Sequence, residues 1–227
     1  MKNSWLASLP EESLRLLEPS LRQIALSAHQ LIAEPGEIPD TVVFPITTVC
    51  SVVVTMEDGK SVESAAIGSE GFAPPAAALG YASRNARTVC QISGDAYAID
   101  VARFREALLH NRPLREAAEE FVGSTMDALM QGAACGAAHT LSQRCARWLL
   151  TLHERIGSAK LKMTHQALAD ALGASRPRIS EVLAQMQKER LVSLHRASLW
   201  VANPVALQLV ACECYAAGRA QPEATAV

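Results

Sequence analysis

The sequence of 227 residues contains no run of eighteen or more apolar residues, so no segment is long enough to span a membrane. Its first fourteen residues lack the apolar core of a secretory signal. We therefore expect a cytoplasmic protein with no membrane partner. None of the six cysteines forms a CxxC pair. In a reducing cytoplasm these cysteines are expected to be free thiols, not disulfides.

Motifs that carry common enzyme chemistry are also missing. The chain has no phosphate-binding P-loop, no GxSxG motif and no HExxH motif. Its acidic pairs, Glu11–Glu12 and Glu119–Glu120, are better explained as charges at a helix start and on a solvated helix face. The sequence thus predicts a protein that is not an enzyme.

The charge of the chain is unevenly distributed, although the net charge is only −2. Residues 1–138 carry 10 Lys and Arg against 17 Asp and Glu, which gives −7. Residues 139–200 carry 10 against 4, which gives +6, and residues 201–227 carry −1. An acidic part joined to a basic part is typical of a regulatory domain that carries a DNA-binding domain. Binding that neutralises phosphates would depend steeply on salt.

The segment from Met163 to Val192 predicts two short helices separated by a turn. One face of the first helix is apolar and is formed by Ala167, Leu168, Ala171 and Leu172. Gly173 is expected to end this helix, because glycine tolerates a positive φ. Ser175 is expected to cap the second helix through its hydroxyl, with Pro177 in the first helical turn.

The second helix and the segment after it indicate a DNA-binding module. The buried side of this helix is predicted to contain Ile179, Val182, Leu183 and Met186. Its exposed side begins with Arg176 and Arg178. Residues 191–202 alternate like a short hairpin, with Arg196 near its tip. A helix-turn-helix followed by such a wing reads base edges from the start of its second helix. An ordinary surface helical hairpin is one alternative, and the wing that follows counts against it. A module that binds proteins through the wing is a second alternative, which the charge of +6 over residues 139–200 opposes.

The N-terminal half has a different texture. After a helical lead-in over residues 4–31, short strand-like segments fall at 42–46, 49–56, 61–67, 89–92 and 96–99. Asp58–Gly59 between two of them predicts a hairpin. Several short strands at this spacing predict a small β-sandwich or jelly-roll barrel.

A long helix is predicted to begin at Pro113. Its apolar face, with steps of one, three and four residues, includes the proposed dimerisation residues Leu114, Phe121, Val122, Met126 and Leu129. A helix of about 25 residues with one apolar face usually needs a partner helix, so a homodimer is expected. The alternative is packing against its own barrel. Further helices are predicted from His139 to Ile156 and from Pro204 to Tyr215.

This order of elements resembles the CRP/FNR family of bacterial transcription regulators. The resemblance covers nearly the whole chain and is most specific in QRCARWLL (143–150), the helix-turn-helix and the wing. It implies an α+β fold with an N-terminal double-stranded β-helix (jelly-roll) barrel over residues 1–111. A dimerisation helix over 112–138, a winged helix-turn-helix over 139–215 and a disordered tail over 216–227 would follow.

The resemblance also implies partners and site residues. The implied partners are double-stranded DNA with a palindromic operator, a second copy of the chain, and RNA polymerase. The segment 175–181 would enter the major groove, and residues 164–166 would touch phosphates. The implied DNA-binding residues are Thr164, His165, Gln166, Ser175, Arg176, Arg178, Ser180, Glu181 and Arg196.

Two residues of the second helix depart from the family pattern. Pro177 replaces an acidic residue that is often used for base reading, and Glu181 stands where many members have a second arginine. The target sequence is therefore not transferable. Glu181 could accept a hydrogen bond from cytosine N4, or it could pair with Arg178.

The effector site of the family is matched only in part. Arg87–Thr88 resembles the family's phosphate-binding pair, and Glu70–Gly71 is an altered form of its ribose-binding pair. Pro74–Pro75 removes two N–H donors that a phosphate would need. The candidate effector-binding residues are Arg87, Thr88, Glu70 and Gly71. The sequence nevertheless argues against a cyclic nucleotide and predicts no cofactor. A nucleotide-gated member or a redox- or haem-sensing member of the family stays an alternative.

No metal site is predicted from the sequence. Cys212 and Cys214 are separated by one residue, and two ligands at this spacing cannot alone complete a tetrahedral zinc site. Whether these two cysteines have a redox or metal role stays open at this point.

Overall fold

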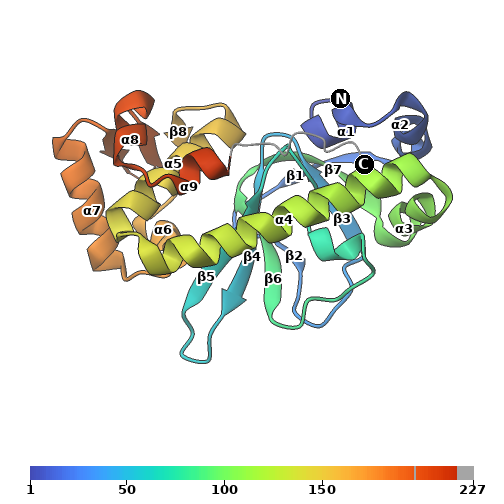
Figure 1. Cartoon of the computed structure of the whole chain (residues 1–227), viewed down its shortest axis with the longest axis horizontal. Helices are drawn as coiled ribbons and strands as arrows, with labels where there is room; N and C mark the ends of the chain where they lie inside the picture. The colour runs from blue at the N-terminus through green and yellow to red at the C-terminus, as the bar shows by residue number, and fades with distance from the viewer. Residues whose placement is uncertain (197, 219–227) are drawn as a thin grey trace. The chain divides into compact units, whose positions relative to one another are not determined.

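A computed structural model describes residues 1–196 and 198–218 of the chain (Figure 1). The chain divides into two compact units, residues 1–127 and residues 128–227. The division falls inside helix α4 (Arg112–Ala138), which continues from one unit into the other. The sequence predicts a domain boundary near residues 137–139, at the end of this helix.

The N-terminal unit contains two antiparallel sheets. One sheet has the strand order β1 (Arg22–Leu26), β7 (Gly94–Asp100) and β3 (Thr41–Pro45). The other has the order β2 (Leu31–Ala33), β6 (Ala86–Ile92), β4 (Val49–Thr55) and β5 (Ser61–Ile67). The predicted α+β fold is confirmed, with a jelly-roll-like sandwich of two sheets in place of a closed barrel.

Local predictions for this unit hold in part. The hairpin expected at Asp58–Gly59 joins β4 to β5, where Thr55 pairs with Ser61 and Gly59 has a φ of 82°. The helical lead-in ends earlier than expected, since β1 already begins at Arg22. The helices of this unit outside α4 are α1 (Ser4–Ser8), α2 (Glu11–Leu17), the 3-10 turns η1 (Glu18–Ser20) and η2 (Pro75–Ala77), and α3 (Val101–His110).

The core of the N-terminal unit is built around aromatic rings. It contains Trp5 and all four phenylalanines of the chain, Phe44, Phe72, Phe104 and Phe121. Trp5 stacks on Phe44 with ring centroids 5.7 Å apart. The indole N–H of Trp5 also donates to the carbonyl of Ala117 at 3.3 Å, which ties α1 to the first part of α4. Burial of large rings supplies much of the stability of a small sandwich.

The first part of α4 packs on its own sandwich, which corrects the predicted dimer contact for two residues. Leu114 is fully buried and Phe121 is 9% exposed, both within the core of the N-terminal unit. A Cβ atom on Gly71 would lie 2.0 Å from two ring carbons of Phe121, so the ring rests directly on that backbone. The helical period of the sequence predicts an apolar face on α4, but it does not predict which part of the structure packs against that face. Val122 is half-buried, and Met126 and Leu129 are exposed.

The C-terminal unit continues from the end of α4 into helices and a small sheet. Its elements are α5 (Leu141–Ile156), β8 (Lys160–Leu161), α6 (His165–Leu172), α7 (Arg176–Lys188), β9 (Val192–His195), β10 (Ser198–Val201), α8 (Pro204–Val210) and α9 (Cys214–Ala217). The antiparallel sheet has the order β8, β10, β9, so a third strand supports the predicted wing. The core residues of α5 are as predicted: Leu141, Cys145, Trp148, Leu149 and Leu152 are all buried.

Two predictions at the C-terminal end differ from the structure. The single helix predicted from Pro204 to Tyr215 is divided into α8 and α9 by an extended residue, Ala211, with a ψ of 152°. The predicted tail begins at residue 216, but α9 continues to Ala217, and residues 219–227 lie outside the described part of the chain. Across the described ranges, no helix is long and apolar enough to cross a membrane.

Candidate nucleic-acid interface

Helix α6 and the turn after it have the geometry that the sequence predicts. Thr164 precedes α6, and its hydroxyl accepts a hydrogen bond from the backbone N–H of Ala167 at 3.1 Å. Gly173 ends the helix with φ 61° and ψ 37°, a left-handed conformation that costs other residues energy. The turn to α7 is therefore set by local chemistry.

The start of α7 corrects one prediction. Ser175 is the N-cap residue and Pro177 lies in the first turn, but the Ser175 hydroxyl makes no capping hydrogen bond. Pro177 at the second helical position has no N–H, which leaves only the N–H of Arg178 at the third position as a donor for such a cap. Ser175 is exposed, so its hydroxyl stays open to solvent or to a partner of the helix.

Most of the predicted DNA-binding residues lie on the surface. The exposed ones are Thr164, Gln166, Ser175, Arg176, Arg178, Glu181 and Arg196, whereas His165 and Ser180 are half-buried. Arg176 and Arg178 occupy the first turn of α7, and Glu181 follows within the next turn. No ion pair joins Arg178 to Glu181 in the part of the chain that the structure describes. Of the two roles open to Glu181, this arrangement favours contact with a partner outside the chain.

The two half-buried residues contact each other. His165 Nδ1 lies 2.9 Å from the Ser180 hydroxyl oxygen, and the hydrogen bond joins the start of α6 to α7. Gln166, one residue later, is exposed and donates through its side-chain amide to Asp170 at 2.7 Å. The structure therefore gives His165 and Ser180 a role in holding the two helices together.

A cleft of about 470 Å³ opens between the helix-turn-helix and the wing. Its lining includes Thr164, His165, Gln166 and Arg176 from the helices, with His195 and Ser198 from the wing. His195 and Ser198 form the last pair of the β9–β10 ladder, next to the turn that carries Arg196. Cationic and hydroxyl side chains of this kind contact phosphate oxygens in protein–DNA complexes. The sequence-based prediction missed His195 and Ser198, although both lie within the predicted wing.

The electrostatics of this region favour an anionic partner. Residues 139–200 carry +6, and the N-terminus of α7 adds the positive end of a helix dipole beside Arg176 and Arg178. Backbone N–H groups at such a terminus are ready donors for phosphate. The exposed surface of α6, α7 and the wing is thus chemically suited to nucleic acid.

The candidate effector residues lie in two places of the N-terminal unit, on β6 and in the segment that follows β5. Arg87 and Thr88 are neighbours on β6, where Thr88 is buried and Arg87 is half-buried on the opposite face. Adjacent strand residues start on opposite faces of a sheet, and the Nε of Arg87 is buried without a hydrogen-bond partner among the described residues. Glu70 accepts a hydrogen bond from the N–H of Gly68, and Gly71 is covered by the Phe121 ring. Whether Arg87 and Thr88 bind an anion stays a prediction.

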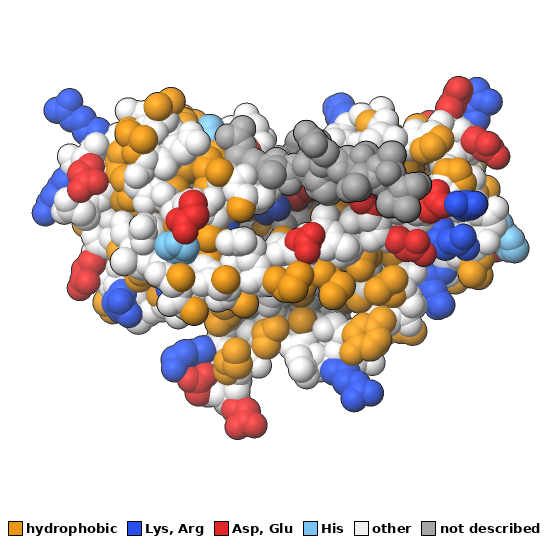
Figure 2. Space-filling view, viewed as in Figure 1, with side chains coloured by type: hydrophobic (Ala, Val, Ile, Leu, Met, Phe, Trp, Pro, Cys, Tyr) orange, Lys and Arg blue, Asp and Glu red, His pale blue; other side chains and the backbone are white. Residues whose placement is uncertain are grey.

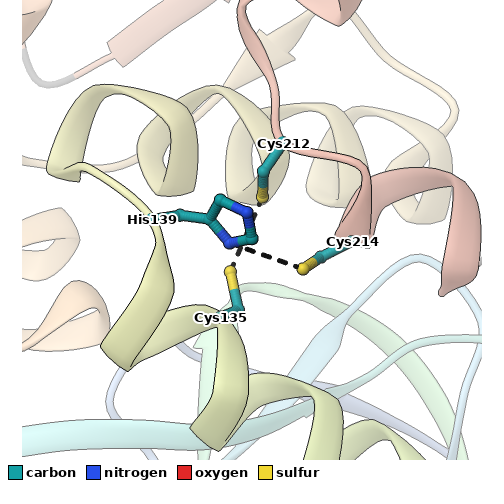
Figure 3. Close-up of side chains that lie close together, drawn as sticks. All are labelled: Cys135, His139, Cys212 and Cys214. Atoms are coloured by element: carbon teal, nitrogen blue, oxygen red, sulfur yellow. Dashed lines mark hydrogen bonds between the residues drawn. The ribbon is translucent and has the colours of Figure 1, made fainter.

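A different group of residues comes together in the C-terminal unit. Cys135, His139, Cys212 and Cys214 present ligand atoms that all lie within 4.8 Å of one another (Figure 3). No spacing pattern signals this group in advance, because its two halves are more than 70 residues apart. All six cysteines of the chain are free, as expected.

The fold and the surface described above define a winged helix-turn-helix protein with an N-terminal jelly-roll unit. Residues 143–210 match the Crp-like helix-turn-helix domain family. Over 47 residues the chain is 38% identical to a protein named Global nitrogen regulator from Synechococcus elongatus, and 34% identical to its namesake from Nostoc sp.. Each alignment covers 21% of this chain, and the chain spans about a fifth of the length of these relatives.

Solved structures extend the likeness to most of the chain. A transcriptional regulator described as crp/fnr family from Eubacterium rectale has a TM-score of 0.68 and 17% identity, covering 90% of this chain and 95% of its own. A CRP-family regulator from Thermus thermophilus has a TM-score of 0.69 and 19% identity, covering 84% and 96%. At these identities the structures show a shared fold. Residues 143–210 therefore form a Crp-like helix-turn-helix domain, and most of the chain shares the fold of these solved CRP/FNR regulators.

Proposed function

We propose that the protein is a DNA-binding transcription regulator that acts as a homodimer on a palindromic operator. The observation that carries the proposal is the exposed pair Arg176 and Arg178 in the first turn of α7, within a Crp-like helix-turn-helix domain of charge +6. Arg176 would donate two hydrogen bonds to a guanine in the major groove. Arg196 in the wing would contact phosphates and contribute affinity without sequence preference.

The proposed dimer uses the exposed part of α4. Met126, Leu129 and Ala133 are exposed and spaced by three and four residues, the repeat of a two-helix coiled coil. Val122, four residues before Met126, continues this repeat but is half-buried against its own sandwich. Met126 is 58% exposed, and Met130, about one helical turn later, is 61% exposed. Figure 2 shows hydrophobic side chains along the exposed face of this helix. A two-fold axis along such a seam would present two copies of α7, which explains the expectation of a palindromic site.

The partners follow from the same proposal. Double-stranded DNA and a second copy of the chain are the direct partners, RNA polymerase is a further one, and the protein would work in the cytoplasm without a membrane. Its action would be binding, not catalysis. The names of the similar proteins, a global nitrogen regulator and several transcriptional regulators, support this class. We expect the sandwich to act without cyclic nucleotide, because Pro74 and Pro75 lack the N–H donors that a phosphate would need.

Selection of an operator tests the proposal. The full-length chain is used to enrich random double-stranded DNA, and the enriched sequence is then titrated in gel shifts at several salt concentrations. We expect a palindromic sequence and an affinity that falls steeply with salt, because phosphate contacts release counterions. The control is a scrambled duplex of the same composition. Equal affinity for the selected and scrambled duplexes would refute sequence-specific regulation and favour a protein-binding module.

A further inference from the structure

Four potential metal ligands converge in the C-terminal unit, away from the helix-turn-helix. Cys135 lies in the last turn of α4, and His139 lies between α4 and α5. Cys212 lies between α8 and α9, and Cys214 is the first residue of α9. Figure 3 shows the three sulfur atoms and the imidazole pointing toward a common centre. The cluster thus joins the end of α4 to the C-terminal segment of the chain.

The distances within the cluster fit one tetrahedral ion. The Sγ atoms of Cys135 and Cys212 are 3.6 Å apart, and Cys214 Sγ is 3.7 Å from His139 Nδ1. Zinc binds sulfur at about 2.3 Å and nitrogen at about 2.0 Å, which separates neighbouring tetrahedral ligands by roughly 3.5–3.8 Å. The cysteine side chains are 1–4% exposed, so the centre is shielded from water. Three sulfurs and one imidazole are a common ligand set of structural zinc.

The surroundings of the cluster orient its ligands. His139 Nε2 lies 3.1 Å from a carboxylate oxygen of Glu213, so the tautomer that donates from Nε2 leaves the Nδ1 lone pair facing the sulfurs. Histidine ligands of metals commonly donate their second ring N–H to a carboxylate in this way. The side-chain amide of Gln131 donates to Cys214 Sγ at 3.0 Å. A hydrogen bond of this kind stabilises a thiolate, the form of cysteine that binds metal.

We propose that Cys135, His139, Cys212 and Cys214 bind one zinc ion. The ion would fasten the segment between α8 and α9 to the junction between α4 and α5. An iron–sulfur cluster distributes its protein ligands over two or more iron atoms, so all four ligands cannot lie as close to one another as they do here. A disulfide between Cys135 and Cys212 would not explain why His139 and Cys214 also lie beside these two sulfur atoms. The proposal does not depend on DNA binding.

Metal content of the full-length protein is the first test. The chain is purified in buffer supplemented with zinc, desalted, and analysed by mass spectrometry for metal per chain. We expect about one zinc per chain in the parent, and its loss in Cys135→Ser, His139→Ala and Cys214→Ser. The matched controls are Cys90→Ser and Cys145→Ser, which change buried cysteines outside the cluster and should keep the zinc.

Cobalt titration of the parent chain gives a readout that does not depend on any variant folding. The metal-free protein, kept reduced, is titrated with Co²⁺ and then with Zn²⁺. We expect strong visible bands of tetrahedral cobalt with a thiolate charge-transfer band, saturating at one equivalent and abolished by one equivalent of zinc. Glu213→Gln, a change at an exposed side chain, should keep the shape of these bands and weaken zinc binding about 10–100-fold.

Several results would overturn the proposal. These are weak octahedral cobalt spectra without saturation, zinc content that the cluster variants do not change, iron–sulfur absorption after anaerobic purification, or a Cys135–Cys212 disulfide in the freshly isolated chain. Gel shifts with the metal-free and zinc-loaded chain separate this inference from the proposed function. Stoichiometric zinc with no specific DNA binding would refute only the regulator, whereas specific DNA binding by a chain that takes up no zinc would refute only the metal site.

Discussion

His165 Nδ1 lies 2.9 Å from the Ser180 hydroxyl oxygen, and this one hydrogen bond connects the first residue of α6 with the middle of α7. A second contact supports it, since Arg144 on α5 donates to the backbone carbonyl of Leu172 at 3.1 Å. The helix-turn-helix is therefore held by polar contacts behind its surface. Arg176 and Arg178 lie on that surface and take no part in these contacts.

Ser180→Ala removes the hydrogen bond to His165. Because a neutral, partly buried hydrogen bond contributes about 0.5–1.5 kcal/mol, we expect the free energy of unfolding in urea to fall by about that amount. DNA affinity should fall to the same extent for the selected and scrambled duplexes, since the change alters the position of α7 and not its base contacts. A loss confined to the selected duplex would instead show that Ser180 reads a base.

Arg176→Ala should weaken binding to the selected operator by about 1–3 kcal/mol, the contribution of one good bidentate contact with a base. Affinity for scrambled DNA should change much less. The comparison variant is Arg196→Ala, which should weaken binding to all sequences alike and reduce the salt slope by about 1. Gel shifts measure both. Unchanged affinity of Arg176→Ala for the operator would contradict the base-reading role.

Met126→Glu should break the homodimer, because an unpaired carboxylate would be buried in the proposed seam of α4. The side chain is 58% exposed in the single chain, so the substitution should leave the fold of each chain intact. Sedimentation at micromolar concentration should show monomer, and operator binding should weaken. Ala128→Glu, also exposed but off the seam by its helical position, is the control that should stay dimeric. A monomeric parent would remove the premise.

Cyclic AMP and cyclic GMP should produce no heat of binding in calorimetry, and neither should change operator affinity. Phe72 and Ala73, which follow the candidate residues Glu70 and Gly71, are fully buried in the core. The cavity beside Pro74 and Thr88 measures about 20 Å³, whereas ligand pockets measure roughly 300–1,000 Å³. Micromolar binding that Arg87→Ala abolishes would contradict this expectation.

Cys145 should resist alkylation in the folded protein. Burial raises the pKa of its thiol from its ordinary value near 9 to about 12, so the reactive thiolate is scarce at neutral pH. Because the folded chain keeps the Cys145 thiol protonated at a pH where the unfolded chain ionises it, the full stability is present below about pH 9. Stability is lost as the pH rises from there toward 12. Stability should therefore decline over this range, less in Cys145→Ala. Rapid labelling by iodoacetamide at about pH 8 without denaturant would contradict this.

Local chemistry made the helix-turn-helix predictable from the sequence. The apolar positions of α5, α6 and α7 recur with the helical period, and their buried faces in the structure follow from that period alone. Gly173 marks the turn because its own backbone freedom suits a left-handed conformation. The positive charge of residues 139–200 likewise follows from the sequence alone. Such features depend on residues within a few positions of one another.

Tertiary structure decided the features that depend on distant residues. Leu114 and Phe121 face their own sandwich, because Gly71 and Phe72 come to lie beneath the phenylalanine ring. Cys135 and Cys212, separated by 77 positions, meet because the chain returns through α8 to the end of α4. An apolar stripe on a helix, or the spacing of cysteines, shows that a residue can be buried or can bind a ligand. Which partner it finds is settled only when the hydrophobic core closes around the whole unit.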